Sequence, residues 1–310
     1  MRKSILIWMT TALVALQGCG GEQEKKTTVK VPLPIDSGAV RLAVMPTLDC
    51  LPFFLASEHG LFASVGLNIV LLPYQAQMDC DTALQRGSAD GMATDLVRSE
   101  CLISQGIPLT YIMRTQASWQ LLTGKAARIS RLKQLDDKML AMTRYSATDL
   151  LADLAVDSAR LKPERVFRIQ VNDVNVRLSM LQNAIMDALL LPEPQATAAR
   201  NLHAAVLLDT RKLDVQLGVV AFKVHVFTDK QQQLFLKAYN QACDSINQQG
   251  LDAYSDIIQK YCGVTQQVVD SLPSNLIFQP AAQPREVDVE RAKAWLKEKE
   301  RIAYVEKRSI

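Results

Sequence analysis

The residues of this sequence that could do chemistry are acidic, hydroxyl and aromatic side chains placed where apolar segments end. Glu193 is the clearest case, because it follows the apolar segment 187–191 and stands between Pro192 and Pro194. Proline fixes φ and removes a backbone donor, so this turn is stiff and holds its carboxylate in a repeatable position. The turn either presents that acceptor to a ligand or is only a rigid surface loop.

Two aspartates occupy comparable positions, and each has two possible roles. Asp49 stands just before Pro52 and a helical pattern, so it either caps that helix or meets a ligand. Asp95 begins another helical pattern, where free N–H groups favour an anion and a carboxylate normally fills that place itself. Trp119 either stacks on a ligand ring or belongs to the core.

The segment TRYSATD adds hydroxyl groups to the set. Ser146 and Asp149 form the Ser-x-x-Asp pattern of a helix start, and Arg144 and Tyr145 should point toward the same crevice. Ligands of open α/β sheets bind outside the carboxyl ends of the strands, where these loops lie. The candidate ligand-binding residues are Asp49, Cys50, Tyr74, Gln75, Thr94, Asp95, Trp119, Arg144, Tyr145, Ser146, Thr148, Asn175 and Glu193.

Motifs of catalytic and metal sites are missing from the sequence. The three histidines, His59, His203 and His225, are not in a zinc-type spacing. Gly124 and Lys125 lack the preceding glycine and the following hydroxyl of a P-loop, and no Gly-x-Ser-x-Gly occurs. We therefore expect no catalytic residue, no metal site and no cofactor.

The elements that position these residues alternate in type along the chain. Short apolar segments separated by helical patterns predict βαβ units and mostly parallel sheets. The C-terminal part differs, because residues 229–260 and 287–305 are largely helical in pattern. The expected strands are RLAVM, NIVLLPY, DGMAT, LTYIMR, KMLAMT, VFRIQV, DALLL and AAVLLD.

Two stretches of the chain echo each other. LQRGSADGMATDLV and LQNAIMDALLLPEPQA each run from a helical pattern into an aspartate, a short apolar strand and then an acidic residue, Asp95 or Glu193. Two similar halves that face each other would place both strand ends on one shared crevice.

The N-terminus reads as an export signal. Arg2 and Lys3 precede an apolar stretch, residues 5–16, which is followed by small residues, as in a secretory signal too short to be a stable spanning helix. Residues 20–38 are rich in Gly, Glu, Lys, Pro and Thr without periodicity and read as a flexible tether.

Composition fits a folded protein without a nucleic-acid partner. Apolar residues make up 48% of the 310 residues, so a core is available. The formal net charge is +3, and it falls to +1 once Arg2 and Lys3 are removed with the signal. This charge gives no electrostatic case for nucleic-acid binding.

The stretch Leu16-Gln17-Gly18-Cys19 resembles the lipoprotein box of bacteria, although an ordinary signal peptide with an incidental cysteine is the alternative. The resemblance implies a signal peptide over residues 1–18, lipid on Cys19 and a tether over residues 19–38. Five further cysteines then remain in an exported protein. Pairs Cys243–Cys262 and Cys50–Cys80 are one reading, and buried free thiols are the other.

Three longer stretches carry a second resemblance: RLAVMPTLDCLPFFLASEHGLFASVGLNIVLLPY, ALQRGSADGMATDLV and MDALLLPEPQATAAR. Together they resemble solute-binding proteins of ABC importers with the type II periplasmic-binding fold, in the branch that binds nitrate, sulfonates and thiamine-precursor pyrimidines. The resemblance implies two α/β lobes, each a mostly parallel sheet flanked by helices, with two crossovers, near 123–128 and 209–217. Lobe 1 would hold residues 39–124 and 212–310, and lobe 2 residues 125–211.

The resemblance also implies a function. We expect a lipid-anchored, monomeric, extracytoplasmic receptor that is not an enzyme and delivers a small molecule to an ABC permease. Two alternatives stay open: an enzyme related to the thiamine-pyrimidine synthases, which use a histidine and pyridoxal phosphate, and a sensor that binds ligand without transport.

Charge gives an expectation about the ligand. Asp49, Asp95 and Glu193 map to the crevice, whereas Arg144 is the one cation placed there. Each unit-charge pair at about 4 Å is worth about 4 kcal/mol at an effective dielectric of about 20. If Asp49 and Asp95 both cap helices, the remaining charges of the site are those of Glu193 and Arg144. These are opposite in sign, so the site would be nearly neutral. We therefore expect a neutral or cationic ligand.

Overall fold

The computed structural model describes the backbone of residues 38–308 and the side chains of residues 38–301. Its first lobe is built on a five-stranded sheet in the order β2-β1-β3-β10-β4. β1 is parallel to β2 and β3, whereas β10 is antiparallel to both of its neighbours. The strands are β1 (Val40–Val44), β2 (Ile69–Pro73), β3 (Gly91–Asp95), β4 (Leu109–Arg114) and β10 (Gly218–Lys223).

The second lobe repeats this plan in the order β7-β6-β8-β5-β9. β6 is parallel to β7 and β8, and β5 is antiparallel to β8 and β9. The strands are β5 (Trp119–Thr123), β6 (Lys138–Met142), β7 (Val166–Gln170), β8 (Ala188–Pro192) and β9 (Ala205–Asp209). The predicted two-lobe α/β fold is therefore confirmed, with each sheet mixed and not mostly parallel, because β10 and β5 are antiparallel to their neighbours.

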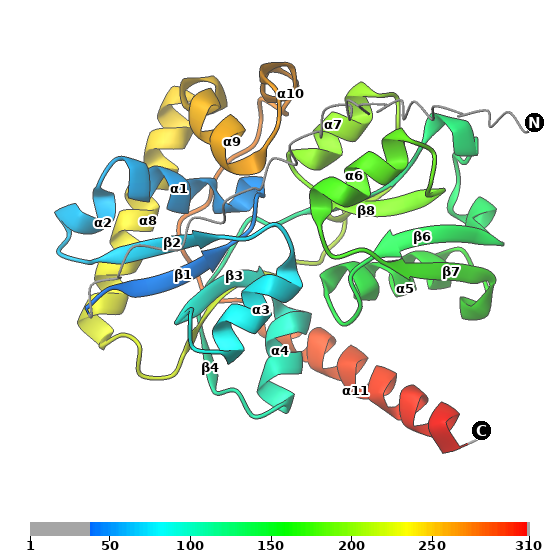
Figure 1. Ribbon diagram of the computed structural model, residues 1–310, viewed down its shortest axis with the longest axis horizontal. Coiled ribbons are helices and arrows are strands. Elements are labelled where there is room, and N and C mark those ends of the chain that lie inside the picture. Colours follow the sequence, from blue (N-terminus) through cyan, green and yellow to red (C-terminus); the bar gives the residue numbers. More distant parts are fainter. Residues whose placement is uncertain (1–37, 309–310) are drawn as a thin grey trace, which may run out of the picture. The chain divides into compact units, whose positions relative to one another are not determined.

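Helices cover the faces of both sheets (Figure 1). Because the sheets are covered, their central strands read as continuous apolar segments, and every residue of β3 and β8 is buried. The helices are α1 (Leu51–Glu58), α2 (Leu61–Ser64), α3 (Gln77–Gln85), α4 (Leu96–Ser104), α5 (Ala147–Ser158), α6 (Val174–Gln182), α7 (Gln195–Asn201), α8 (Asp229–Gln249), α9 (Ser255–Cys262), α10 (Gln266–Asp270) and α11 (Glu286–Arg308).

Aromatic packing joins α8 to the first sheet. Phe235 of α8 stacks on Phe53 of α1 with ring centroids 6.0 Å apart and meets the edge of Phe222 from β10 at 5.6 Å. Tyr239, one turn further along α8, lies 5.0 Å from Phe53. All four rings are buried, so α8 is part of the core that holds the strand ends of this lobe in place.

The first crossover lies earlier than the sequence suggested. Thr123 was expected to begin the crossover, but it pairs with Ala188 and Ala205 inside the second sheet, so the chain passes between lobes at 115–118. It returns through 210–217 to β10. β5 and β10 were both missed, because each receives the chain directly after a crossover and is antiparallel to its neighbours. Neither belongs to the strand–helix alternation that marks the other strands.

The C-terminal helix α11 contacts both lobes. It packs along α4 of the first lobe and continues past α5 of the second (Figure 1). Trp295 Nε1 donates to Asp153 Oδ2 of α5 at 2.7 Å, and Lys299 Nζ lies 2.8 Å from the same oxygen. The expected division, with α11 wholly in the first lobe, therefore omits its contacts with the second.

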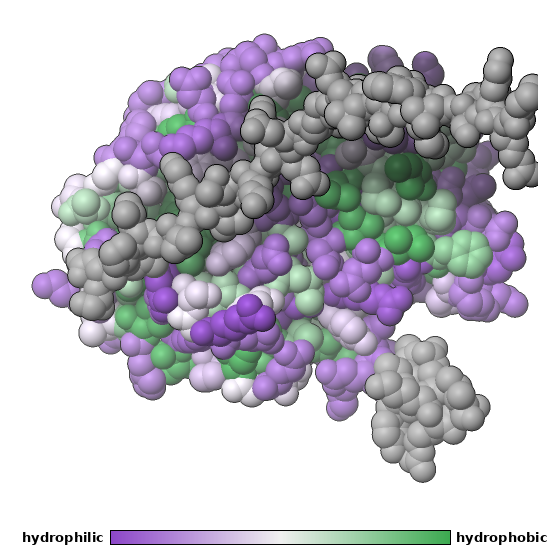
Figure 2. All heavy atoms as spheres, in the orientation of Figure 1, coloured by the Kyte–Doolittle hydropathy of each residue, from purple (hydrophilic) through white to green (hydrophobic). Residues whose placement is uncertain are grey.

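The surface of the second lobe carries apolar side chains. Figure 2 shows hydrophobic residues over α6 and the neighbouring strands, and Phe167, Val176 and Ile185 are among the exposed large hydrophobics. Scattered exposure of this kind is common in soluble proteins. Among the helices described here, none has an apolar stretch long enough to cross a bilayer.

Candidate ligand-binding site

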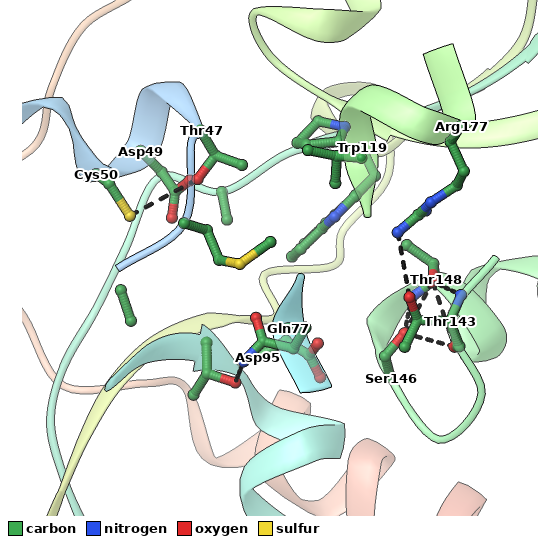
Figure 3. A pocket seen from close by; sticks show the side chains of 16 residues that line it. Thr47, Asp49, Cys50, Gln77, Asp95, Trp119, Thr143, Ser146, Thr148 and Arg177 are labelled. Carbon is green, nitrogen blue, oxygen red and sulfur yellow. Dashed lines mark hydrogen bonds between the residues drawn. The ribbon is translucent and has the colours of Figure 1, made fainter. Parts of the chain in front are cut away.

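A cavity of about 60 Å³ lies between the two lobes, at the carboxyl ends of β1, β3, β6 and β8 (Figure 3). Both lobes contribute polar side chains to its wall, as expected for the crevice of an open α/β fold. Of the candidate residues, the cavity is lined by Asp49, Cys50, Thr94, Asp95, Trp119, Ser146 and Thr148. It is also lined by residues outside the set of candidates: Met45, Thr47, Gln77, Ala93, Ala117, Thr143, Val174, Arg177 and Pro192.

Asp49 forms part of the first-lobe wall. It lies in a 3₁₀ turn after β1, and no side chain caps α1, so the expected capping role is not used. Thr115 Oγ1 instead donates to Asp49 Oδ2 at 2.8 Å. Burial raises the pKa of the Asp49 carboxyl, while hydroxyl groups of Thr47 and Thr115 act in the opposite direction.

Asp95 is the second acid of this wall. It ends β3 and caps α4, accepting from the backbone N–H of Arg98 at 2.9 Å. Burial raises the pKa of Asp95 to about 7, against the lowering effect of the N–H groups of Arg98, Ala147 and Val97. Around neutral pH this carboxyl therefore exchanges between its charged and neutral forms.

Hydroxyl groups dominate the second-lobe wall. Ser146 caps α5 by accepting from Thr148 N at 3.1 Å, and its hydroxyl donates to the carbonyl oxygen of Thr143 at 2.7 Å. Thr148 Oγ1 accepts from Thr143 N at 2.9 Å. The capping motif differs in detail from the expected one, because Asp149 accepts from Tyr145 N and not from Ser146 N.

Arg177 is the cation of the cavity, and the sequence analysis missed it. It extends from α6 toward the hydroxyl cluster (Figure 3) and is only 3% exposed. Nη1 donates to the carbonyl of Leu190 at 2.6 Å and Nη2 to Thr143 Oγ1 at 3.1 Å, while the buried Nε has no partner among the described residues. Burial lowers the pKa of Arg177 to about 10, opposed by the charge of Asp173, so the side chain stays protonated at neutral pH.

No sequence pattern distinguished Arg177. It is the fourth residue of α6, on a helix whose residues do not show a clear apolar face, so its direction toward the cavity depends on tertiary packing.

Six of the candidates lie outside the cavity: Tyr74, Gln75, Arg144, Tyr145, Asn175 and Glu193. Gln75 and Asn175 bond to each other across the lobes, with Asn175 Nδ2 donating to Gln75 Oε1 at 3.1 Å. The Arg144 side chain is exposed, and the carbonyls of Arg144 and Tyr145 accept from Arg98 Nη1 of the first lobe at 3.3 Å each. The side chains of Gln75 and Asn175 and the main chain of Arg144 and Tyr145 therefore join the lobes around the cavity.

Glu193 also points away from the cavity. Its carboxylate accepts from Thr197 N at 2.9 Å and pairs with Arg200 Nη1 at 2.9 Å inside the second lobe. Its carbonyl oxygen accepts from Leu48 N of the first lobe at 2.8 Å. Next to it, Gln195 Nε2 donates to the carbonyl of Pro46 at 2.8 Å. The stiff Pro-Glu-Pro turn thus presents its main chain to the facing lobe.

Residues 47–244 match the family model described as NMT1/THI5 like. The chain belongs to the NMT1/THI5-like family. This result confirms the family branch predicted from the sequence. A search of curated proteins finds no match to the chain.

Solved structures share the fold of this NMT1/THI5-like protein. The periplasmic aliphatic sulphonate binding protein SsuA from Escherichia coli has a TM-score of 0.70 and 18% identity, over 89% of each chain. The periplasmic nitrate-binding protein NrtA from Synechocystis has a TM-score of 0.68 and 16% identity, over 81% of this chain and 74% of its own. A ligand-binding component of an ABC-type import system from Staphylococcus aureus, with zinc bound, has a TM-score of 0.70 and 14% identity, over 85% and 92%.

The described cysteines of this NMT1/THI5-like protein are all free and buried: Cys50, Cys80, Cys101, Cys243 and Cys262. Neither suggested pair forms, so the free-thiol alternative holds for them. Burial raises the pKa of the Cys50 thiol well above its usual range, which keeps it protonated in the cavity wall. Cys19 and the preceding residues lie outside the described part of the chain.

Within residues 38–301, no group of three or more His, Cys, Asp or Glu side chains is arranged to hold a metal ion. The cavity lining contains no histidine. The donors that it does contain are suited to hydrogen bonds and ion pairs with a small organic or inorganic solute.

Proposed function

We propose that this protein is a solute-binding protein that captures a small molecule outside the cytoplasm and delivers it to the permease of an ABC importer. The observation that carries the proposal is the convergence of charged and hydroxyl side chains from both lobes on one interlobe cavity. Membership of the NMT1/THI5-like family and the fold shared with periplasmic binding proteins support it.

A cavity lined by both lobes suits a mechanism in which the lobes close around the ligand. Polar contacts between the lobes, such as Leu48 with Glu193 and Gln75 with Asn175, surround the cavity and form only when the lobes are together. A ligand that touches both walls shifts the equilibrium toward this closed state by its differential affinity for it. The closed state is then the form that a permease would recognise.

We further propose that the protein is anchored to the membrane by lipid on Cys19, with residues 20–38 as tether, and that it acts as a monomer. The support is the signal-like N-terminus and the Leu-Gln-Gly-Cys sequence. The alternative enzyme, which would use a histidine in the cleft, receives no support from a cavity lined without one.

The test is a thermal-shift screen of amines, sulfonates, pyrimidines, vitamins and amino acids against the purified protein. A true ligand at a hundredfold its dissociation constant should stabilise the protein by roughly 2.7 kcal/mol. Small-angle scattering with and without that ligand should then show closure. The proposal would be contradicted if no solute stabilised the protein. It would also be contradicted if deleting the gene left cellular uptake of the identified solute unchanged.

A further inference from the structure

We propose that the cavity binds a small zwitterion, with its cationic group held by Asp49 and Asp95 of the first lobe and its anionic group by Arg177 of the second. This inference rests on the proposed solute-binding function and names the chemical class of the solute. It starts from three ionisable groups in the cavity wall that form no ion pair among the described residues.

Arg177 differs from the other buried arginine. Arg98 is also buried, but it forms an ion pair with Asp81. Arg177 donates only to the carbonyl of Leu190 and the hydroxyl of Thr143, and no carboxylate forms an ion pair with it in residues 38–301. A buried guanidinium without an ion-pair partner is strongly unfavourable. Arg177 lines the cavity, and its Nε has no hydrogen-bond partner among the described residues. An anionic ligand group would supply the missing charge.

Asp95, which is buried, and Asp49, which is partly buried, differ in the same way from the buried acids elsewhere in the described chain. Five buried carboxylates each pair with an arginine: Asp81, Asp149, Glu193, Asp209 and Asp288. A sixth, Glu100, accepts from the Tyr111 hydroxyl at 2.6 Å away from the cavity. Asp49 and Asp95 have only hydroxyl and backbone N–H partners, and both line the cavity. Loss of contact with water raises the pKa of both carboxyls, and among the described residues no cation lies beside either to oppose it.

The acidic and basic groups of the cavity lie on different lobes. The carboxyls belong to the first lobe and the guanidinium to the second, on separate sides of the cavity (Figure 3). A simple cation would leave Arg177 unpaired, and a simple anion would leave the carboxyls unpaired. A zwitterion satisfies both walls and so favours the closed state. It is neutral overall, which refines the sequence-based expectation of a neutral or cationic ligand.

Size limits the ligand further. A cavity of about 60 Å³ has room for only a few heavy atoms between its charged ends. Trp119 and Met45 supply apolar wall surface against which a short carbon chain could pack. The probes of choice are therefore short amino acids and aminosulfonates with an unbranched chain.

The experiment compares three matched classes of probe on the full chain by calorimetry and thermal shift. The zwitterions are glycine, 3-aminopropanoate, 4-aminobutanoate and 2-aminoethanesulfonate; the anions lack the amine, and the amines lack the anionic group. We expect at least one zwitterion to bind about tenfold or more tightly than both of its matched relatives. Its affinity should fall by about tenfold or more in Arg177→Gln and in Asp49→Asn.

Two control variants separate the cavity charges from net charge. Arg144→Gln and Asp79→Asn remove exposed charges outside the cavity, and they should leave the affinity unchanged. If Arg177→Gln fails to fold, Arg177→Lys keeps the charge without the planar fork and should bind with intermediate affinity. The comparison of matched probes on the unmodified protein needs no variant.

The inference is overturned if none of the zwitterions binds, if an anion or amine alone binds as tightly, or if Arg177→Gln leaves zwitterion binding unchanged. Binding of another solute in that case would reject the zwitterion and leave the solute-binding function standing. Failure of every class, together with a negative broad solute screen, would reject both.

Discussion

Asn175 Nδ2 donates to Oε1 of Gln75 at 3.1 Å and joins the second lobe to the first. Both residues had been expected to touch the ligand, and they touch each other. Asn175 Oδ1 also accepts from Gln195 Nε2 at 3.2 Å, so the contact extends into the buried part of the interface. Replacing Gln75 by Ala removes one interlobe bond without touching the cavity lining.

We expect Gln75→Ala to raise the ligand dissociation rate constant by about two- to tenfold, because one hydrogen bond is worth about 0.5–1.5 kcal/mol. Stopped-flow displacement measures this rate. Gln85→Ala is the matched control, since Gln85 bonds to Gln105 within the same lobe. Equal rates for the two variants would mean that the Gln75–Asn175 bond does not hold the lobes together.

Asp95 predicts a pH dependence of stability. Its pKa is raised to about 7 from an ordinary value of 3.8, so between these values the folded protein keeps a proton that the unfolded chain has lost. The free energy of unfolding therefore falls as pH rises from about 4 to 7, by no more than about 4 kcal/mol from this group. In Asp95→Asn this contribution is absent.

The measurement is denaturant unfolding of ligand-free protein and of Asp95→Asn at pH 5 and pH 8. Contributions of other groups cancel in the difference between the two proteins. The variant should lose less stability than the unmodified protein over this interval. A pH dependence identical in both would show that Asp95 titrates normally in the folded state.

Asp153 links α11 to the second lobe. It accepts from Trp295 Nε1 and also pairs with Lys299 and Arg168. Trp295→Phe removes one hydrogen bond and should lower the free energy of unfolding by about 1 kcal/mol, and Asp153→Ala should lower it by about 2 kcal/mol. Glu290→Ala, which breaks an exposed pair with Lys293 on the same helix, should change it by less than about 0.5 kcal/mol.

Scattering distinguishes a local effect from a change between the lobes. We expect Asp153→Ala to increase the radius of gyration of the ligand-free protein, because a contact that spans the lobes is lost. An unchanged radius together with the stability loss would restrict the role of Asp153 to anchoring α11.

Buried free thiols predict insensitivity to reducing agents. The five described cysteines form no disulfide, so dithiothreitol should leave the midpoint of thermal unfolding unchanged. Burial raises the pKa of Cys80 and Cys262 as well as of Cys50, and a protonated, covered thiol reacts slowly with thiol reagents. A lower midpoint in reductant would point to a disulfide in the purified protein.

Cys19 provides the test of membrane anchoring. Cells expressing the chain with labelled palmitate should yield a labelled protein, and Cys19→Ala should abolish the label because the acceptor thiol is gone. Labelling that survives this substitution would contradict the lipoprotein hypothesis.

The sequence revealed the sheets through a pattern that is strong wherever a strand and a helix alternate. β1, β3 and β6 belong to that pattern, and the residues at or just after their ends that reach the cavity are Asp49, Asp95, Ser146 and Thr148. β5 and β10 lie outside it, so the first crossover was misplaced.

Side-chain direction was less predictable than position. Glu193 lies at the predicted strand end, but Thr197 and Arg200 draw its carboxylate into the second lobe, and both partners follow it on α7. Arg144 directly follows Thr143, which lines the cavity, but its own side chain is exposed to solvent. Arg177 reaches the cavity from α6, although no sequence pattern distinguished it. These outcomes depend on tertiary contacts that periodicity does not record.

The hydrogen bond from Leu48 N–H to the carbonyl of Glu193 uses main-chain atoms alone. Substitutions at either residue therefore preserve it, apart from proline at position 48, which has no N–H to give. This contact between the two lobes therefore does not depend on the side chains that determine which solute binds. During evolution the polar side chains of the cavity can therefore change while this contact between the lobes is kept. A new ligand specificity does not require a new interlobe contact.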